Sequence, residues 1–458
     1  MLVLYNPRYK EDPIRSQLPE ELSELHGELA TIDKIMEDER FLEPFIKRFY
    51  KRIGRPSTPV DVYLRMMILK RRYKLGYEAL EREVSDSFKW RRFCHLSVSE
   101  RVPDSTTLDK LTQKYGEDAI NQLNDLLVRK INEEKIIRSR RVRGDTTVVE
   151  ANIHYPTDAS LLNDSVKVIA RDVRRLKEMG VGVAEKFRDR SRSAKRKLLS
   201  VVKVAQKRNN QAKEEIKESV KQLKEKAERT VKEADCVVKR AKEEIRQGGQ
   251  GISQKVKSHV KRLEEKIEIA KKIILQTEEV LSGNLHIKER IISLHDWEAR
   301  PIKRDKFGKE TEFGYKLYLQ DTPEKIITSH KLYEGNPADC APAAPGIQEH
   351  AQILGKPPDQ AAFDRGFTGA EAEIQGLGVK QVSIPKRGKK SQKRKEFERQ
   401  RWFRRLQRFR AGGEATISVL KRRFQIGRSL YHGFKGAKCW VGWGIFTYNL
   451  TMAARLIR

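Results

Sequence analysis

The chain has 458 residues and a formal net charge of +32, with 96 Lys and Arg against 64 Asp and Glu. This length allows two or three domains and at least one substantial core. A positive surplus of this size indicates a polyanionic partner, usually nucleic acid, because each neutralised phosphate releases counterions. No stretch approaches the ~20 apolar residues that span a bilayer, and the first residues lack the pattern of a secretory signal. We therefore expect a cytoplasmic, nucleoid-associated protein with no membrane partner.

Residues 1–135 are predicted to form an all-α N-terminal domain. Residues 60–73 alternate apolar and basic side chains at helical spacing, and Asp104 or Ser105 can cap a helix that follows Pro103. A small basic helical domain indicates a helix-turn-helix-like DNA-binding domain. A packing domain without base contacts explains the same pattern, and no recognition helix can be singled out, so both interpretations stay open.

Residues 166–289 are predicted to form a highly charged helical insertion. Apolar residues recur at steps of four and three from Ile216 to Val238 and again from Val256 to Ile274, which is typical of a coiled-coil seam. Gly248–Gly251 allows the chain to reverse between these runs. We expect an antiparallel coiled-coil hairpin, preceded by one more helix that ends near Gly180. Its charges indicate either a solvated face or a surface for DNA or a partner.

The flanking segments, residues 136–165 and 290–458, have mixed structure. In chain order they predict a strand with Asp145, two paired strands, a helix, a short strand ending at Asp364, a helix, a strand, and a helix with Glu414. This is the order of the RNase H-like α/β fold, a mixed sheet with flanking helices in which carboxylates at two adjacent strand ends and on a following helix converge. Such carboxylates can hold two divalent ions for phosphoryl transfer.

The amino-acid sequences of these segments resemble those of DDE transposases from bacterial insertion sequences. Val142–Leu162 is similar to their first-Asp segment and Ala362–Phe367 to their second-Asp segment. Arg410–Lys421 resembles their signature helix, Tyr-x2-Arg-x3-Glu-x6-Lys, although Gln407 stands at the Tyr position. Residues 59–111 are similar to the N-terminal domain common in this group, and the overall likeness is to the ISNCY-like type.

The resemblance implies a DNA transposase that uses Asp145, Asp364 and Glu414 as catalytic residues and metal ligands. Two Mg²⁺ ions, with Mn²⁺ as a substitute, would serve cleavage at insertion-sequence ends and strand transfer into target DNA. The partners implied are the double-stranded end and target DNA, with a homodimer in the synaptic complex. Arg410 and Lys421 would contact DNA near the transposon end. An ordinary ion pair between Arg410 and Glu414 is the alternative explanation of their spacing.

Residues 386–410 form a basic strip, about half Lys or Arg, with aromatic residues interleaved. Such a strip can follow a phosphate backbone while an aromatic ring stacks on a base. The DNA-contact residues expected here are Lys389, Lys390, Trp402, Arg404 and Arg405. A basic loop whose aromatic rings belong to the core is the alternative.

Two other functions fit the same sequence. One is a non-catalytic DNA-binding or scaffold protein descended from a transposase. The other is a metal-dependent nuclease that cleaves without joining. The intact carboxylates argue against the first, and only an assay for joined product separates the second from a transposase.

Overall fold

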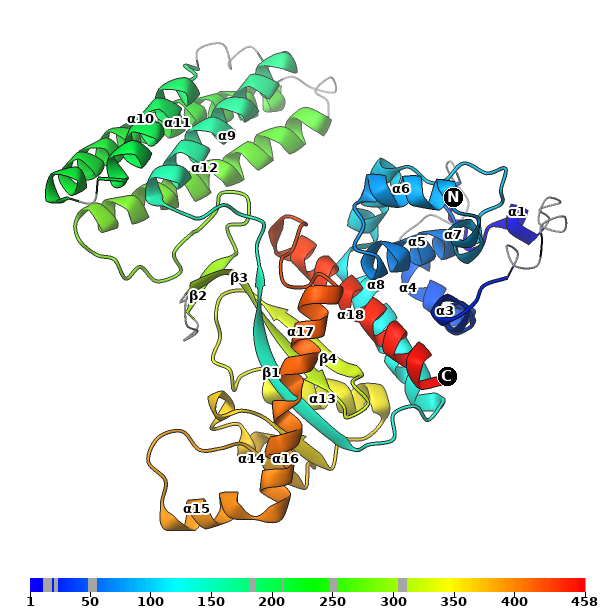
Figure 1. Ribbon diagram of the computed structural model, residues 1–458. Helices are drawn as coiled ribbons and strands as arrows, with labels where there is room; N and C mark the ends of the chain where they lie inside the picture. Colours follow the sequence, from blue (N-terminus) through cyan, green and yellow to red (C-terminus); the bar gives the residue numbers. More distant parts are fainter. Residues whose placement is uncertain are drawn as a thin grey trace. The chain divides into compact units, whose positions relative to one another are not determined.

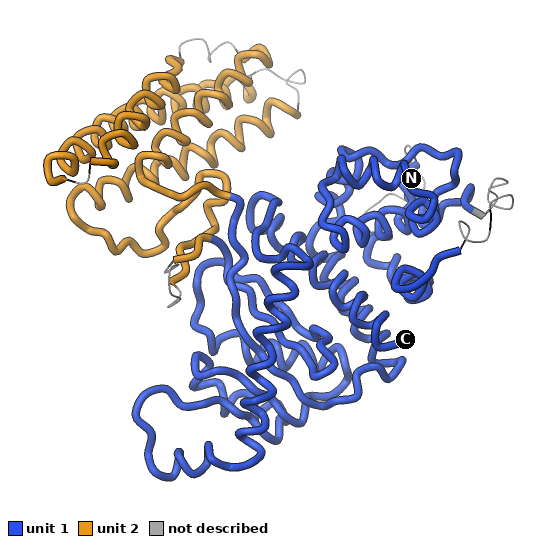
Figure 2. Tube along the Cα trace, in the orientation of Figure 1, with its two compact units in different colours: residues 1–152, 314–458 blue, residues 153–313 orange. Residues whose placement is uncertain are grey.

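The computed structural model (Figure 1) describes residues 1–10, 19, 24–47, 56–181, 187–207, 209–247, 254–303 and 311–457. The chain divides into two compact units, one made of residues 1–152 and 314–458 and the other of residues 153–313 (Figure 2). The unit that contains the insertion is therefore wider than the expected 166–289. The N-terminal helices and the sheet belong to one unit, whereas the sequence suggested a separate domain.

The sheet of the first unit is centred on β1 (Arg141–Glu150). β1 pairs antiparallel with β3 (Thr311–Asp321) from Gly314 to Asp321, and parallel with β5 (Gln360–Ala362) over its first residues only. β4 (Ile327–Tyr333) extends the antiparallel side beyond β3, and β6 (Gln381–Ser383) extends the parallel side beyond β5. The strands that the sequence predicted are confirmed. The sheet has the order β2-β3-β1-β5-β6, where β2 is Arg300–Lys303, and β4 also pairs with β3.

The two faces of this sheet are covered by different helices, because successive side chains of β1 alternate between the faces. On the face of Gly144, the rings of Phe363 and Tyr318 pack so closely that a Cβ on Gly144 would lie 2.3 Å from the Phe363 ring. Tyr318 also packs against Gly346 of α13. Arg143 points to the other face and contacts Gly413 of α17. The helices around the sheet are α13 (Ala343–Leu354), α14 (Glu371–Gly376), α15 (Gln392–Arg399), α16 (Arg401–Ala411) and α17 (Gly413–Arg423).

The N-terminal helices share one hydrophobic core with the closing helix α18. α5 is buried along nearly its whole length, and even Arg65 is buried, where its guanidinium is paired with Asp61 at 2.8 Å. α5 is therefore a packing helix with no face left to read DNA. Asp104 caps α8 by accepting the Thr107 N–H at 2.8 Å, as the sequence predicted. The helices of this layer are α1 (Pro7–Lys10), α3 (Glu28–Met36), α4 (Glu43–Ile46), α5 (Val60–Arg72), α6 (Tyr77–Asp86), α7 (Phe88–Phe93), α8 (Ser105–Glu133) and α18 (Gly433–Ile457).

The second unit is a bundle in which α11 and α12 run antiparallel. Lys242 pairs with Glu264 at 2.5 Å, whereas Lys271, further along α12, pairs with Asp235, earlier in α11, at 2.8 Å. The expected turn at Gly248–Gly251 lies outside the described residues. The hairpin is not a bare two-stranded coiled coil, because α9 supplies its own apolar stripe and packs on both helices, and α10 packs on α9 and α11. The elements of this unit are α9 (Asp158–Glu178), α10 (Ser191–Ala205), α11 (Asn210–Gln247), α12 (Gln254–Leu281) and β2 (Arg300–Lys303).

The closing helix α18 is rich in apolar residues, yet it is buried in the core of the first unit. Across the described ranges, no helix has the length and apolar character needed to cross a membrane.

Candidate active site

Asp145 and Asp364 lie in matching register on neighbouring parallel strands. β1 and β5 pair so that Arg143 is opposite Ala362, and each Asp follows two residues later. β5 ends at Ala362, whereas β1 continues to Glu150. Asp145 is therefore inside its strand rather than at the strand end, which corrects the expectation. Asp145 lies just beyond Arg143, the last residue of β1 that pairs with β5, on the side of the sheet where β5 has ended. Both carboxylates are half-buried.

Arg143 links the centre of the sheet to the helices that cover Asp145. Its guanidinium donates to both carboxylate oxygens of Asp321, at 2.7 and 2.8 Å, and to the carbonyl of Phe409 at 2.7 Å. Thr416 donates to Asp321 at 2.9 Å and accepts from Arg143 at 3.3 Å. Burial raises the pKa of Asp321, against the lowering effect of the Arg143 guanidinium. Paired buried charges of this kind hold a single geometry, because each satisfies the other's hydrogen bonds.

The helix expected around Glu414 is two helices joined at Gly412. α16 ends at Ala411 and α17 begins at Gly413, although Gly412 itself keeps helical dihedral angles, φ −66° and ψ −10°. A Cβ on Gly412 would lie 2.7 Å from Nη1 of Arg143. The two glycines weaken the helix here and in return let the Arg143 side chain approach the joint.

The structure brings Arg410 beside Asp145 but leaves Glu414 on the flank of the helix. Arg410, Asp145 and Gly413 line one narrow cavity together with Arg143 and Thr416. Glu414 lies in the first turn of α17 and is exposed, next to Gly413, which faces the cavity. Both Arg410 and Glu414 are described, and they form no ion pair with each other, so their spacing does not reflect a simple salt bridge.

Lys421, the last residue of the signature, lies at the other end of α17. It belongs to the last turn of that helix and is half-buried. Its aliphatic stem packs on the backbone at Gly427, where an added Cβ would lie 3.6 Å from Lys421 Cβ. Part of the Lys421 side chain therefore serves packing.

Gln407, at the Tyr position of the signature, points into the fold. Its amide nitrogen donates to the carbonyl of Phe363 at 3.1 Å, to the carbonyl of Ser383 at 2.9 Å and to the Ser383 hydroxyl at 3.0 Å. Phe363 directly precedes Asp364. The Gln407 side chain thus ties α16 to the ends of β5 and β6, and this inward orientation takes it away from a DNA contact.

Asp339 is a further carboxylate at this edge, which was not predicted from the sequence. One oxygen accepts from the Thr146 hydroxyl at 2.8 Å and from Lys316 at 2.6 Å. The other lies 3.0 Å from the position that a Cβ on Gly366 would take, and so does Oδ1 of Asp364. Asp339 follows β4 in a loop with no recognisable motif. Only the spatial pairing with Thr146 reveals it.

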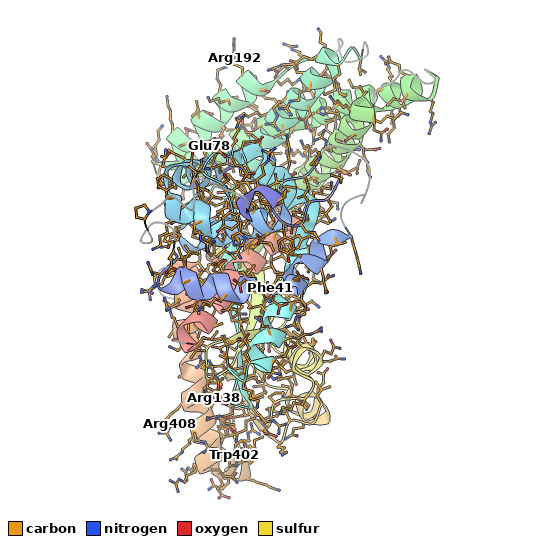
Figure 3. All side chains as sticks on the ribbon, turned by 90° about the vertical axis from the view of Figure 1, so that its right-hand side faces the viewer. Phe41, Glu78, Arg138, Arg192, Trp402 and Arg408 are labelled. Atoms are coloured by element: carbon orange, nitrogen blue, oxygen red, sulfur yellow. The ribbon has the colours of Figure 1, made fainter. Side chains whose placement is uncertain are left out.

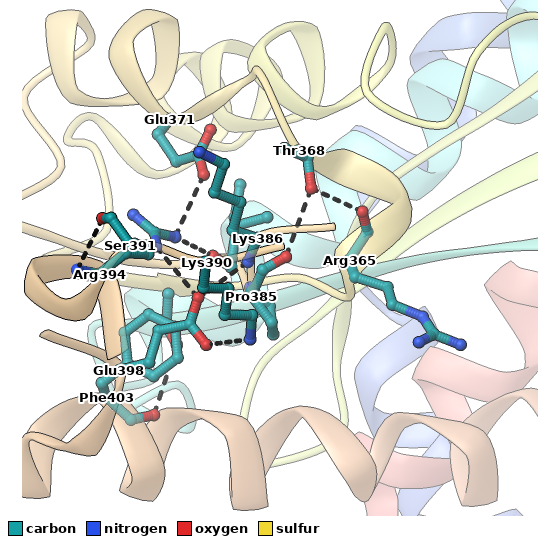
Figure 4. A network of polar contacts seen from close by, with 12 residues as sticks. Arg365, Thr368, Glu371, Pro385, Lys386, Lys390, Ser391, Arg394, Glu398 and Phe403 are labelled. Carbon is teal, nitrogen blue, oxygen red and sulfur yellow. Dashed lines mark hydrogen bonds and ion pairs between the residues drawn. The ribbon is translucent and has the colours of Figure 1, made fainter. Parts of the chain in front are cut away.

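The part of the basic strip that precedes α16 is partly neutralised by Glu398 (Figure 4). Lys390 pairs with Glu398 at 2.5 Å, Arg394 donates to it at 3.0 Å, and the Lys386 N–H donates at 2.9 Å. Burial alone would raise the pKa of Glu398, but these donors lower it. Lys390 is therefore engaged within the protein, whereas Lys389 is exposed.

α16 carries an exposed arginine stripe and an aromatic cluster. Trp402 packs edge-to-face against Phe397 and Phe403, with ring centroids 5.5 and 5.6 Å apart, and it is half-buried. Phe403 is buried, so this ring belongs to the core, which is the alternative to DNA contact for the aromatic residues of the strip. Arg408 projects outward from the same helix (Figure 3). The exposed stripe, at helical spacing, consists of Arg401, Arg404, Arg405 and Arg408.

The donors at this site suit hard divalent cations, which prefer carboxylate oxygens. The matched register of Asp145 and Asp364, with Asp339 close to Asp364, supplies such donors at one edge of the sheet. Among the residues that the structure describes, no three Asp, Glu, His or Cys side chains are gathered into a ready-made metal cluster. The carboxylates are of the chemical kind that binds a divalent metal, and the strand register brings Asp145 and Asp364 to the same edge of the sheet. Glu414 is the one expected ligand that lies apart from them.

Two models of known protein families match parts of the chain. Residues 16–114 match a family model described as a transposase domain (DUF772), and residues 288–450 match one described as a transposase DDE domain. Searches of the curated proteins and of the solved structures found no match. The second family model includes Asp364, Gln407 and Glu414, and it begins after the helical bundle. The chain therefore belongs to the DDE transposases of insertion sequences.

Proposed function

We propose that the chain cleaves DNA at insertion-sequence ends and joins the freed ends to target DNA, with Asp145, Asp364 and Glu414 as its catalytic carboxylates. The observation that carries this proposal is the matched register of Asp145 and Asp364 across β1 and β5. An RNase H-like core is part of the proposal. The order β2-β3-β1-β5-β6, antiparallel on the β3 side of β1 and parallel on the β5 side, supports it.

The proposed cofactor is a pair of Mg²⁺ ions, for which Mn²⁺ can substitute. DDE transposases generally use divalent metal ions. Asp145, Asp364 and Glu414 would hold them, and when bound they would activate the attacking oxygen and stabilise the leaving one. Three carboxylates without a cation would repel the reacting phosphate, so a bound cation would favour its entry into the site.

In the proposed first step a water oxygen attacks the phosphorus at the transposon end. The bond from phosphorus to the 3′ oxygen breaks, leaving a free 3′-hydroxyl and a 5′-phosphate. That hydroxyl then attacks a target phosphorus and displaces a target 3′ oxygen, so one phosphodiester replaces another and no external energy source is required. Arg410, which lines the cavity beside Asp145, would counter the charge on the phosphate.

The DNA on either side of the reacting phosphate would lie along α16. Arg404 and Arg405 belong to its exposed stripe, and Lys389 is exposed in the preceding strip. Such side chains follow a phosphate backbone without reading sequence. Trp402, half-buried, retains an accessible part for stacking on a displaced base. Joining two ends to one target requires two active sites, which is the reason to propose a homodimer in the synaptic complex.

The decisive assay uses the purified full chain, Mg²⁺, a supercoiled target plasmid and labelled DNA from both flanks of its own coding sequence. Joined product is expected from the wild type. Asp145→Asn, Asp364→Asn and Glu414→Gln should each retain DNA binding and lose cleavage. Glu373→Gln, an exposed change outside the site, is the matched control and should react normally. Cleavage without joining would identify a nuclease, and binding without either would identify a scaffold protein.

A further inference from the structure

The helix α10 has a surface unlike that of the other helices in its bundle. It contains five basic residues and no acidic residue between Ser191 and Ala205. In α9, α11 and α12, by contrast, basic and acidic residues alternate, and many are paired, as Lys266 is with Asp172 at 2.5 Å. None of the basic side chains of α10 forms an ion pair with a residue that the structure describes. The five are Arg192, Lys195, Arg196, Lys197 and Lys203.

Most of these charges lie on one exposed face. Ala194 and Val201 are buried in the bundle core, so the opposite side of α10 faces outward. Arg192 projects away from the bundle there (Figure 3). Residues three and four apart share a helix face, and the exposed positions follow that spacing. This α10 face consists of Arg192, Lys195, Arg196, Leu199, Val202 and Lys203.

A basic cavity lies at the N-terminal end of the same helix. It has a volume of about 410 Å³, and its one carboxylate, Glu233, is already held by Arg190 at 2.5 Å. Arg190 immediately precedes α10 and also lines this cavity. The other charged residues of the lining are Arg229, Lys232 and Arg240. The uncompensated positive charge thus continues from the α10 face onto α11.

We propose that the α10 face is a second DNA-binding surface, which holds the phosphate backbone of duplex DNA independently of the catalytic core. From Arg192 to Lys203 the helix advances about 16 Å, which corresponds to several phosphates along one strand. The charges can therefore meet successive phosphates. The inference rests on the proposed function only in taking DNA as the substrate.

The composition of the face favours DNA over the other candidate partners. Between two copies related by a two-fold axis, the same patch meets itself, so Lys195 and Arg196 would oppose like charges. A membrane surface requires a broad apolar side, but the apolar side of α10 is used in the bundle core. Leu199 and Val202, half exposed at 50 and 51%, are too few to anchor a helix in lipid.

The test compares two matched quadruple variants of the full chain. One replaces Arg192, Lys195, Arg196 and Lys203 by Gln. The control replaces four exposed basic residues of α12, Lys257, Lys261, Arg262 and Lys272, by Gln. Both remove the same charge from the same bundle, and thermal unfolding monitored by circular dichroism verifies that both fold. The readout is the dependence of duplex affinity on salt, measured by fluorescence anisotropy with a random-sequence duplex.

The α10 variant should bind at least about 10-fold more weakly at low salt, and its salt slope should fall by about 2 to 4. The α12 control should stay near the wild type. Equal behaviour of the two variants would overturn the proposal. Two results would reassign the face: dissociation of an oligomer by Leu199→Gln with unchanged DNA binding, or loss of binding to anionic vesicles alone. A wild type that binds duplex without cleaving it would refute the proposed function but not this surface.

Discussion

Arg143 and Asp321 form a buried bidentate ion pair that fastens β1, β3 and the α16–α17 joint together two residues before Asp145. The same guanidinium reaches the Phe409 carbonyl at 2.7 Å. This one pair of side chains thus positions both Asp145 on the sheet and α17, the helix that carries Glu414. Their relative placement depends on this pair more than on any contact between Asp145 and Glu414 themselves.

Breaking this pair should damage both stability and cleavage. Arg143→Met leaves the Asp321 carboxylate buried without its partner, which costs about 3 to 5 kcal/mol. The double variant Arg143→Met with Asp321→Leu should recover most of that stability, because no unpaired charge remains. It should still cleave roughly 100-fold more slowly, since the joint is no longer held in place. Urea unfolding and single-turnover cleavage measure the two effects. Wild-type cleavage by the double variant would show that the pair has no positioning role.

Gln407→Leu should destabilise the edge of the sheet next to Asp364. The change removes the Gln407 donor from the carbonyls of Phe363 and Ser383, of which the Ser383 carbonyl still accepts the Phe363 N–H at 3.0 Å. Loss of the donor to the buried Phe363 carbonyl costs about 1 to 3 kcal/mol. The exposed change Gln392→Leu on α15 is the matched control and should shift stability by less than about 0.5 kcal/mol. If Gln407→Leu weakened DNA binding while stability stayed unchanged, Gln407 would act as a DNA contact as the Tyr position of the signature implies.

Lys390 and Arg404/Arg405 should respond differently to substitution. Lys390 is paired with Glu398 at 2.5 Å, so Lys390→Gln should leave the salt slope of DNA binding unchanged. Arg404 and Arg405 are exposed on α16, and the double Gln variant should lower that slope by about 1 to 2. Binding titrations at several salt concentrations measure this. A larger loss from Lys390→Gln would mean that its pair with Glu398 opens when DNA binds.

Stability should fall in mild acid because of His350. Burial lowers the pKa of His350 to about 4 from the ordinary value of 6.5. Between these pH values the unfolded state binds the proton and the folded state resists it. The stabilisation is therefore complete above about pH 6.5 and is lost as the pH falls toward 4, on the order of 3 kcal/mol in all. Urea midpoints at pH 7 and pH 5 should differ less for His350→Gln than for the wild type. Equal differences would exclude His350 as a source of the acid sensitivity.

The order of strands and helices was predictable because it rests on local pattern. β1 has β-branched residues at Val142 and again from Thr146 to Val149, which favour a half-buried strand. The motifs around Asp145 and Asp364 identified these carboxylates, but the end of β5 two residues before Asp364 depends on tertiary pairing and was not predictable. The Arg143–Asp321 pair joins positions 178 residues apart, and no local signal connects them.

In the helical insertion too, local patterns could be predicted from the sequence but tertiary packing could not. The heptad steps in α11 and α12 predicted the hairpin, because those steps are local. The packing of α9 on both helices is a tertiary fact, so the sequence suggested a two-stranded coiled coil where the structure has a bundle. The uniform charge of α10 was visible in the sequence. Its outward orientation became clear only once Ala194 and Val201 were seen to be buried.

The central claim is that Asp145, Asp364 and Glu414 together hold the metal ions. The most direct measurement is a crystal structure of the full chain with end DNA and Mn²⁺, in which anomalous diffraction locates the ions independently of the model built into the density. We expect anomalous peaks in contact with all three carboxylates and with the DNA phosphate. Peaks bound by other side chains, or by Asp364 and Asp339 without Asp145 and Glu414, would contradict it.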